Sequence, residues 1–331
     1  MVHKYDQNKS KAPTTFMADI LYPLLGLLAA SALLMLGAEI LIKACKLFSR
    51  ALDVSEAFSG ITLMSIATSS PEIFVSLGAH FSDHTALALG NLAGSNIANI
   101  LLVYGLGCLL FLKPNHSRSL MSRTDMIAFV LSSLAFFLVI FYGLYSFLAG
   151  ALLLLFYCGY IGFSYITEHN GTSHKNTVRE FSGPIALKLL AFSLAGAVVL
   201  YAGSELIIYS GTSLARIFNI PESTIGLTAV AVGTSLPELV VLLLSARRMS
   251  EEFVIANIIG SNVFNITLIP GLMFLILPTQ APIYLENIGV IFFALCSLLF
   301  IIKSQLSRRF SITSGAIFLM LYAAFIYRLA A

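Results

Sequence analysis

The chain alternates between long apolar runs and short polar breaks. A helix needs about 20 apolar residues to cross the roughly 30 Å hydrocarbon layer of a bilayer. Measured against that length, the pattern predicts ten membrane-spanning helices, and the break between the fourth and the fifth, near Gly143 and Tyr145, is the least clearly marked. The ten spans cover residues 18–42, 57–80, 85–112, 125–144, 147–167, 185–208, 222–246, 251–277, 286–303 and 311–329.

The composition agrees with a membrane protein. Hydrophobic residues make up 58% of the 331 residues and charged residues only 11%, with a mean hydropathy of +0.91. Soluble domains carry about 25% charged residues, because their surface faces water. We therefore expect an all-α integral membrane protein whose surface faces the lipid bilayer. The net charge of +3 does not indicate a nucleic-acid partner.

Costly polar residues recur at a fixed spacing of 166 residues, from Gly37 to Gly105 without a gap. Matched Glu, Asn and Pro inside membrane spans are not explained by shared hydrophobicity, because each is expensive there. Five spans per copy is an odd number, so the second copy must lie upside down relative to the first. The sequence thus predicts two inverted five-helix repeats. The matches pair Gly37 with Gly203, Glu39 with Glu205, Gly60 with Gly226, Thr62 with Thr228, Thr68-Ser69 with Thr234-Ser235, Pro71-Glu72 with Pro237-Glu238, Asn91 with Asn257, Gly94-Ser95-Asn96 with Gly260-Ser261-Asn262, and Asn99 with Asn265.

The distribution of Lys and Arg predicts the orientation. If the amino terminus lies outside, the inward links hold 14 of the 19 basic residues, as the positive-inside rule expects. We predict a multi-pass protein of the cell (inner) membrane with both termini extracytoplasmic. The predicted parts are a polar tail (1–17), the first repeat (18–167), a short cytoplasmic link (168–184) and the second, inverted repeat (185–331).

The repeated motif places a proline and a glutamate in the middle of the second and seventh spans. Proline displaces the carbonyl four residues earlier, which here belongs to Ala67 or Gly233. In the first copy, Ser65, Thr68, Ser69 and Glu72 are spaced to share one face of a helix. The second copy repeats Thr234, Ser235 and Glu238, with Ala231 in place of the first serine. The third and eighth spans add polar stripes at steps of four residues: Asn91, Ser95 and Asn99, then Asn257, Ser261 and Asn265.

The predicted site offers only oxygen ligands: carboxylates, amides, hydroxyls and backbone carbonyls. Hard cations prefer oxygen, and Ca²⁺ takes about 6–8 such ligands, whereas zinc and copper favour sulfur or imidazole. The four cysteines are isolated and read as packing residues. The two facing carboxylates, Glu72 and Glu238, would repel each other when no ion is bound, and one divalent ion would neutralise both.

At these residues the sequence resembles the cation/Ca²⁺ exchanger superfamily, whose best-known branch is the sodium/calcium exchangers. Gly233-Thr-Ser-Leu-Pro-Glu238 and Gly260-Ser-Asn-Val-Phe-Asn265 are similar to that family's alpha repeat, and the first copy differs at Ala67 and Ser70. The resemblance implies ten helices in two inverted halves. It also implies a central cation site made by Glu72, Glu238, Asn99, Asn265, Ser95, Ser261, Thr68, Thr234, Ser69 and Ser235, with further sodium ligands in the backbone oxygens of Ser65 and Ala231.

One position departs from the pattern of the family, in which sodium/calcium exchangers commonly have Asp where this chain has Asn265. The pocket then carries a formal charge of −2, which one Ca²⁺ balances and three Na⁺ would exceed. We therefore hypothesise that the stoichiometry is not three sodium ions per calcium. The long regulatory domain of animal exchangers has no counterpart in residues 168–184.

The expected function is a secondary-active antiporter that exchanges Ca²⁺ for Na⁺ by alternating access, without a cofactor, and not an enzyme. Coupling to H⁺ is the first alternative, and the partners are the ions and the lipid bilayer. An intramembrane hydrolase would need a base beside a nucleophile, and a passive channel usually closes its pore by oligomeric symmetry. A purely structural role for buried Glu72 and Glu238 leaves the duplication unexplained. Glu39 and Glu205 are expected to be structural, and His80 and His84 to be solvated interface residues, not proton relays.

Overall fold

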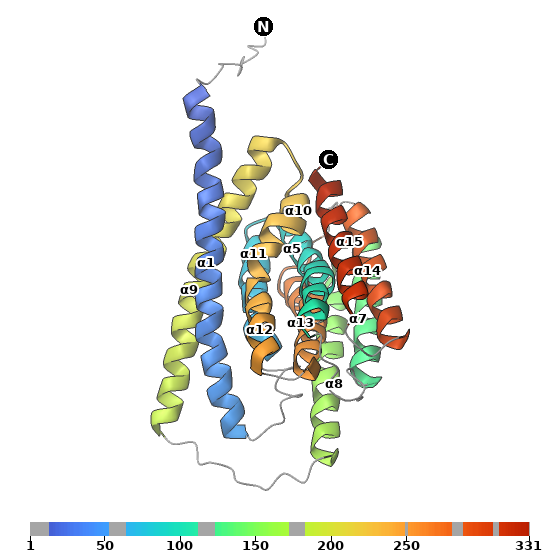
Figure 1. Cartoon of the computed structure of the whole chain (residues 1–331). Helices are drawn as coiled ribbons and strands as arrows, with labels where there is room; N and C mark the ends of the chain where they lie inside the picture. The colour runs from blue at the N-terminus through green and yellow to red at the C-terminus, as the bar shows by residue number, and fades with distance from the viewer. Residues whose placement is uncertain are drawn as a thin grey trace.

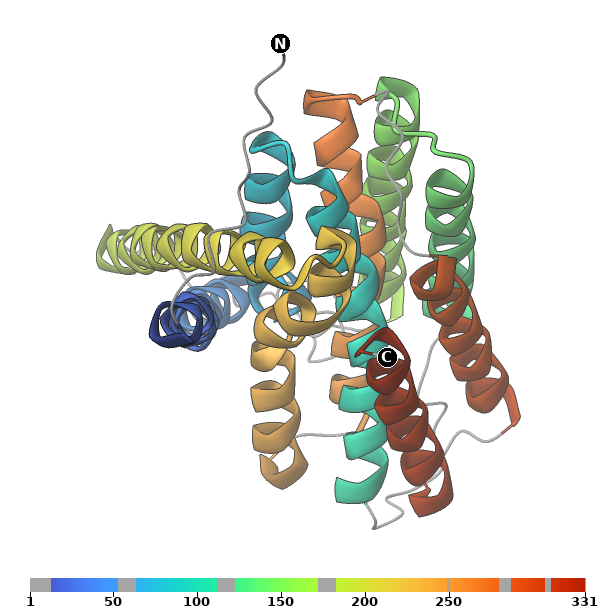
Figure 2. The ribbon, with the colours of Figure 1, turned by 90° about the horizontal axis from the view of Figure 1, so that it is seen from above.

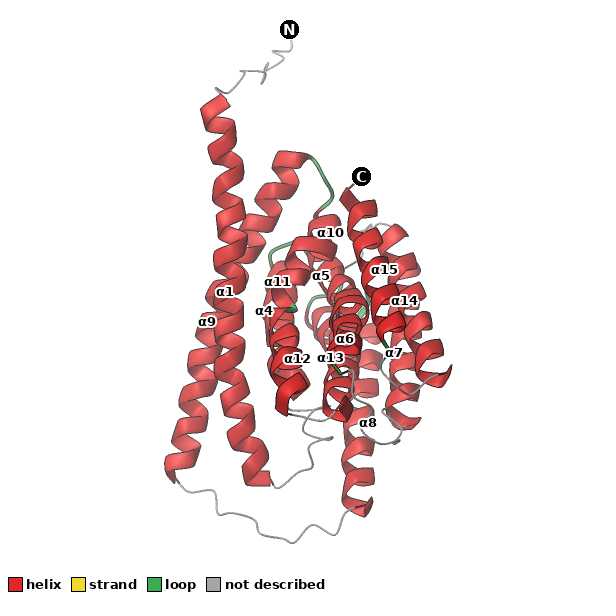
Figure 3. Cartoon of the chain, viewed as in Figure 1, coloured by secondary structure: helices red, strands yellow, loops and turns green. Residues whose placement is uncertain are grey.

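The computed structural model describes residues 13–52, 64–111, 123–171, 183–248, 251–279, 287–306 and 311–330. All of the regular secondary structure in these ranges is helical (Figure 1; Figure 3). The helices of the first half are α1 (Pro13–Leu52), α3 (Ser65–Thr68), α4 (Ser70–Phe81), α5 (Thr85–Ala98), η2 (Asn99–Val103), α6 (Tyr104–Leu110), α7 (Arg123–Phe141) and α8 (Phe147–Gly171). Those of the second half are α9 (Gly183–Phe218), α10 (Glu222–Ile225), η3 (Gly226–Val230), α11 (Ala231–Thr234), α12 (Leu236–Arg248), α13 (Glu251–Ile276), α14 (Asn287–Leu306) and α15 (Ile312–Ala330).

Within the described ranges, eight helical stretches are long and apolar enough to cross a membrane, and Gly289–Ser304 is a shorter apolar helix. The expected second span corresponds to α3 and α4, and the start of that span, residues 57–63, lies outside the described residues. The described chain is thus an all-helical protein with several apolar spans.

Several helices extend beyond their predicted ends. The first begins at Pro13 and not near Ala18, since proline is well tolerated in the first turn of a helix. Helix α9 continues to Phe218, well past the predicted end at residue 208. The turn near Gly143 does exist: Gly143 has a φ of +64°, a left-handed conformation that ends α7 before α8 starts.

The bundle has a buried centre and an exposed flank. In the spans Thr85–Leu110 and Val254–Ile276, 83% of the most apolar window is buried, against 22% in Asp19–Ala44. Helices α1 and α9 pack side by side along one flank, and the view from above shows them outside the central group (Figure 2). The central helices therefore carry the polar motifs, while the flanking helices face lipid.

Both motif spans break at the same place. Ser69 interrupts the helix between α3 and α4 with φ −85° and ψ 10°, and Ser235 separates α11 from α12 with φ −83° and ψ 7°. The prolines two residues later explain both breaks, because each removes a backbone donor and its ring displaces the preceding turn.

Packing recurs in matched pairs between the halves. Helix α8 packs on α13 as α15 packs on α6, and α5 packs on α11 as α13 packs on α3. The glycine contacts repeat as well: a Cβ at Gly37 would meet Leu200, and one at Gly203 would meet Leu34. Gly37 and Gly203 are 166 residues apart, and so are Leu34 and Leu200. Positions that match in the sequence therefore make matching contacts in the structure.

Candidate cation site

Glu72 and Glu238 occupy equivalent places, one in the first turn of α4 and the other in the first turn of α12. Each follows a helix break directly, so its carboxylate lies near the positive end of a helix dipole, which favours negative charge. Glu72 is 0% exposed and Glu238 is 1% exposed. A carboxylate buried so completely needs hydrogen bonds or a cation.

Each carboxylate is held by a serine from the other half of the chain. The hydroxyl of Ser69 donates to Oε1 of Glu238 over 3.0 Å, and that of Ser235 donates to Oε1 of Glu72 over 3.3 Å. Ser261 on α13 adds a bond of 3.4 Å to the same oxygen of Glu238. The two motif breaks therefore meet, and each supplies a donor to the acidic residue of the other.

A second reciprocal pair lies beside the first. The hydroxyls of Thr68 and Ser261 are 3.3 Å apart, and those of Ser95 and Thr234 are 3.2 Å apart. All four side chains are buried. Thr234 also donates to Oδ1 of Asn91 over 3.0 Å, which ties α11 to α5. The structure thus brings together the hydroxyl residues that the motifs predicted.

The carbonyl oxygens of Ser65 and Ala231 already accept two hydrogen bonds each. Ser69 N–H and the Thr68 hydroxyl donate to Ser65 O, at 2.9 and 3.4 Å. Ser235 N–H and the Thr234 hydroxyl donate to Ala231 O, at 3.0 and 3.2 Å. A cation at either carbonyl would have to replace one of these donors. The role of both residues as sodium ligands stays a prediction.

Among the buried oxygen atoms of the described residues without a hydrogen-bond partner are Oε2 of Glu72, Oε2 of Glu238, Oδ1 of Asn99 and Oδ1 of Asn265. Leaving a buried acceptor without a partner costs about 1–3 kcal/mol, and more for a charged group. These four atoms belong to side chains that the resemblance implies as cation ligands. Carboxylate and amide oxygens suit a hard cation, and a cation bound by them would supply the missing partners.

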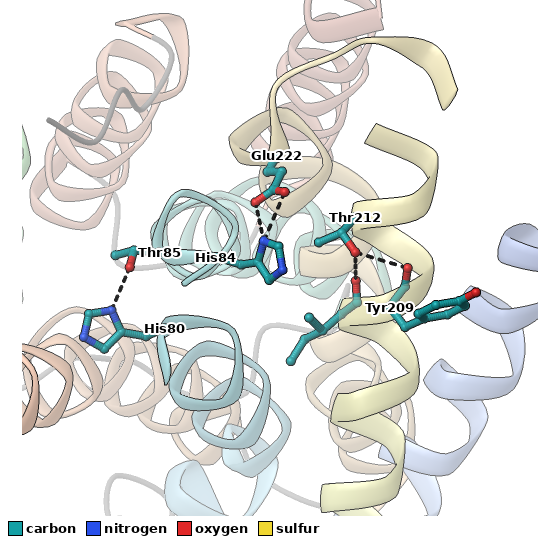
Figure 4. A network of polar contacts seen from close by, with 7 residues as sticks. His80, His84, Thr85, Tyr209, Thr212 and Glu222 are labelled. Carbon is teal, nitrogen blue, oxygen red and sulfur yellow. Dashed lines mark hydrogen bonds and ion pairs between the residues drawn. The ribbon is translucent and has the colours of Figure 1, made fainter. Parts of the chain in front are cut away.

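Two expectations need correction. The carbonyl of Ala67, expected to be left free by the proline, accepts a bond of 2.6 Å from the Ser70 hydroxyl. The second copy has Leu236 at that position and no hydroxyl to donate. His80, expected to be solvated, is 1% exposed and contacts Thr85 Oγ1 at 2.9 Å and Leu277 O at 2.8 Å (Figure 4).

Asn96 and Asn262 were not selected as site residues from the sequence. Asn96 donates to the carbonyl of Asn262 over 3.1 Å, and Asn99 donates to Oδ1 of Asn262 over 3.4 Å. Both asparagines are 0% exposed and lie at equivalent positions of the two copies. Their exact match across 166 residues was the signal that could have marked them.

Comparison with known proteins agrees with the geometry. The family model described as sodium/calcium exchanger protein matches residues 22–166 and again residues 188–330. The two matches begin at positions that lie one repeat spacing apart, as the internal duplication predicts.

Relatives and solved structures cover most of the chain. It is 33% identical to inner membrane protein YrbG of Escherichia coli over 77% of this chain and 82% of the relative. It is 29% identical to sodium/calcium exchanger MaX1 of Methanosarcina acetivorans over 91% of this chain and 96% of the relative. A structure of the sodium–calcium exchanger NCX_Mj, soaked with Na⁺ and Sr²⁺, superposes with a TM-score of 0.64 at 27% identity, covering 93% and 98% of the two chains. The chain therefore belongs to the sodium/calcium exchanger family of membrane transporters.

Proposed function

We propose that this protein is a secondary-active antiporter that exchanges Ca²⁺ for Na⁺ by alternating access. The observation that carries the proposal is the state of the two buried glutamates: Oε1 of each accepts a bond from the other half, and Oε2 of each has no partner. A divalent cation between them would neutralise both charges. Membership in the family supports cation exchange, and the NCX_Mj structure was soaked with Na⁺ and with Sr²⁺, a divalent ion of the same group as Ca²⁺.

The proposed ligands are Glu72 and Glu238 with the amide oxygens of Asn99 and Asn265. The hydroxyls of Thr68, Ser69, Ser95, Thr234, Ser235 and Ser261 orient the carboxylates or join the coordination as ions exchange. A hard cation that takes about 6–8 oxygens requires more than the four unpartnered atoms, so some hydroxyls must contribute.

The proposed architecture is ten spans in two inverted repeats, in the cell membrane, with both termini extracytoplasmic. The double match of the family model and the paired packing of the helices support the repeats. The bias of Lys and Arg supports the orientation. Inversion brings both motif breaks to the middle of the bundle, where secondary transporters bind their substrates.

Coupling to H⁺ is the second candidate. Two buried carboxylates can be neutralised by protons as well as by metal ions, and Asn265 removes the third carboxylate that would favour several Na⁺. Calcium uptake into proteoliposomes, driven by a sodium gradient or by a pH gradient in separate runs, distinguishes the two coupling ions.

The decisive experiment measures radiolabelled calcium flux for the wild type, Glu72→Gln and Glu238→Gln. Each substitution keeps the size of the side chain and removes one charge, so we expect flux to fall by at least about tenfold, the change that 1.4 kcal/mol of lost binding produces. Ser132→Ala is a matched control, because Ser132 is buried on α7 and bonds only within its own helix, to Phe129 O. Undiminished flux in both glutamine variants would overturn the site.

A further inference from the structure

The turn between α4 and α5 carries two histidines that bond to different helices of the other half. His80 contacts the carbonyl oxygens of Leu277 and Met273 at the end of α13, at 2.8 and 3.2 Å. His84 contacts Glu222, the first residue of α10 (Figure 4). The end of α4 and the turn that follows it therefore contact both the start of α10 and the end of α13, at the same end of the bundle.

The contact between His84 and Glu222 is close and reachable from water. Nδ1 of His84 lies 2.9 Å from Oε2 and 3.1 Å from Oε1 of Glu222, and the side chains are 24% and 28% exposed. When Nδ1–H donates to the carboxylate, Nε2 can still take a second proton. Histidine is the side chain whose charge changes between about pH 5 and pH 8. Protonation therefore converts a hydrogen bond into an ion pair without rearrangement.

Glu222 is joined to the candidate cation site through a short, continuous stretch of backbone. Helix α10 leads through the π-helical segment η3 to α11, which ends at Thr234, and Ser235 follows. The whole stretch lies against α5: a Cβ at Gly90 would be 2.4 Å from Ser223 O, and one at Gly94 would be 2.6 Å from Leu227 O. Whatever holds Glu222 in place also holds α10 and η3 against the helix that carries Ser95.

We propose that His84 and Glu222 form a latch at this end of the bundle, tightened by protons, that restricts the movement of α10 and so slows ion access from this side. The proposal rests on the antiport function above and adds a regulator to it. His84 and Glu222 are positioning residues, since neither reaches the cation site. The contact is a partly exposed ion pair, and such pairs contribute about 0.2–1 kcal/mol, which corresponds to a change in rate of at most about fivefold.

Other charged or titratable groups lie near this turn. Asp83 precedes His84 with a φ of +65°, and His80 lies on the last turn of α4. Arg216, in the last turn of α9, lines a groove with Asp19 and Tyr22 of α1. The hydrogen bonds of the His84 ring are to Glu222, across the halves, so its added charge acts first on the latch.

The latch belongs to one end only. The position equivalent to Glu222 in the first copy is Glu56, but the position equivalent to His84 in the second copy is Ser250, which has no imidazole. The glutamate is thus present in both copies, whereas the histidine is present in the first copy alone. Protons are therefore expected to act from one side of the membrane, the side that the sequence predicts to be extracytoplasmic.

The test is calcium flux in proteoliposomes of known orientation, with the pH on the latch side varied from about 6 to 8. The wild type should slow by about two- to fivefold at the lower pH relative to His84→Gln and Glu222→Gln, which lose the ion pair. His84→Lys carries a permanent charge and should stay slow at both values. Asp83→Asn is the matched control: it removes a neighbouring charge, suits the left-handed backbone, and should keep the wild-type profile.

A second measurement needs no transport. Hydrogen–deuterium exchange of the amides from Glu222 to Val230, compared between variants at a single pH near 6, should be faster in His84→Gln and Glu222→Gln than in the wild type. If hydrogen exchange differs between the variants while neither the wild type nor any variant transports calcium, the latch is supported and the proposed antiport function is wrong. If exchange and the pH profile are the same in wild type and both glutamine variants, the latch is overturned.

Discussion

At the scale of single residues, the reciprocal hydrogen bonds allow the same substitution to be made in each half and the two effects to be compared. Ser69 holds Glu238 and Ser235 holds Glu72, so each hydroxyl acts on the carboxylate of the other copy. Both motifs form a single cluster in which each acid accepts a hydrogen bond from the opposite copy, and Glu238 accepts a further one from Ser261 of its own copy.

Replacing either serine by alanine is therefore expected to weaken calcium binding. A hydrogen bond to a charged group contributes about 1.5–3 kcal/mol, so Ser69→Ala and Ser235→Ala should each raise the half-saturating calcium concentration by about tenfold or more. The measurement is calcium dependence of flux, with Ser132→Ala as the unaffected control. An effect in one variant alone would contradict the reciprocal arrangement.

Residue types and spacing were sufficient to predict Glu72, Glu238 and the hydroxyl residues that now lie together. Polar residues are costly inside membrane spans, so each one is informative. Asn96 and Asn262 were not selected although they match across the repeat, because the contact that joins their two helices is visible only in the fold. The burial of His80 was missed for a related reason: the carbonyls that accept its contacts lie at the far end of α13.

At the scale of helices, glycines on α5 set how closely it approaches the segment that leads to the site. Gly94→Ala would place a Cβ 2.6 Å from Leu227 O and 2.7 Å from the Cβ of Ala231. Backbone atoms cannot move aside cheaply, and overpacking of this kind typically costs about 1–3 kcal/mol. We expect a lower melting temperature in detergent and reduced flux.

Gly159→Ala provides the comparison within the same chain. A Cβ at Gly159 on α8 would meet nothing within 4 Å, and alanine favours helix by up to about 1 kcal/mol over glycine. Its melting temperature should be unchanged or slightly higher. Equal destabilisation by both substitutions would show that the contact between α5 and η3 is not what limits Gly94.

The existence of the helices was predictable from apolar runs, and their breaks at Ser69 and Ser235 from the prolines that follow. The ends of the helices were not predictable, because an apolar run marks the part of a helix that crosses the bilayer, and a helix can continue beyond it. Helix α9 extends nearly three turns past the predicted end at residue 208, and it ends just before Asn219, which has a positive φ. The π-helical segments η2 and η3 had no signal in the apolar pattern at all.

At the scale of the whole molecule, the charge of the site governs coupling. The described part of the chain contains no group of three or more His, Cys, Asp or Glu arranged to hold a metal, which leaves the two glutamates as the acidic pair of the site. With Asn265 as an amide, we propose that one Ca²⁺ exchanges for fewer than three Na⁺.

Asn265→Asp adds the missing carboxylate and should raise the number of sodium ions exchanged per calcium. Burying a further charge is expensive unless a cation accompanies it, so an additional Na⁺ would bind with the new acid. The ratio follows from the sodium gradient at which net calcium flux through reconstituted vesicles is zero, with the membrane potential clamped at zero. The isosteric Asn99→Asp adds a carboxylate at the equivalent position of the first copy and serves as the companion variant. A ratio of three sodium ions per calcium in the wild type would contradict the hypothesis.

The reciprocal bonds between Ser69 and Glu238 and between Ser235 and Glu72 also bear on how such a chain could arise. The serine two residues before each motif proline donates to the acid of the opposite copy, so a single five-helix copy lacks that donor. A one-copy ancestor would therefore need a second molecule, inserted in the membrane the other way up, to make these two bonds. Joining two copies in one polypeptide would keep that pairing while the copies diverge, as Ser70 and Leu236, or His84 and Ser250, have done.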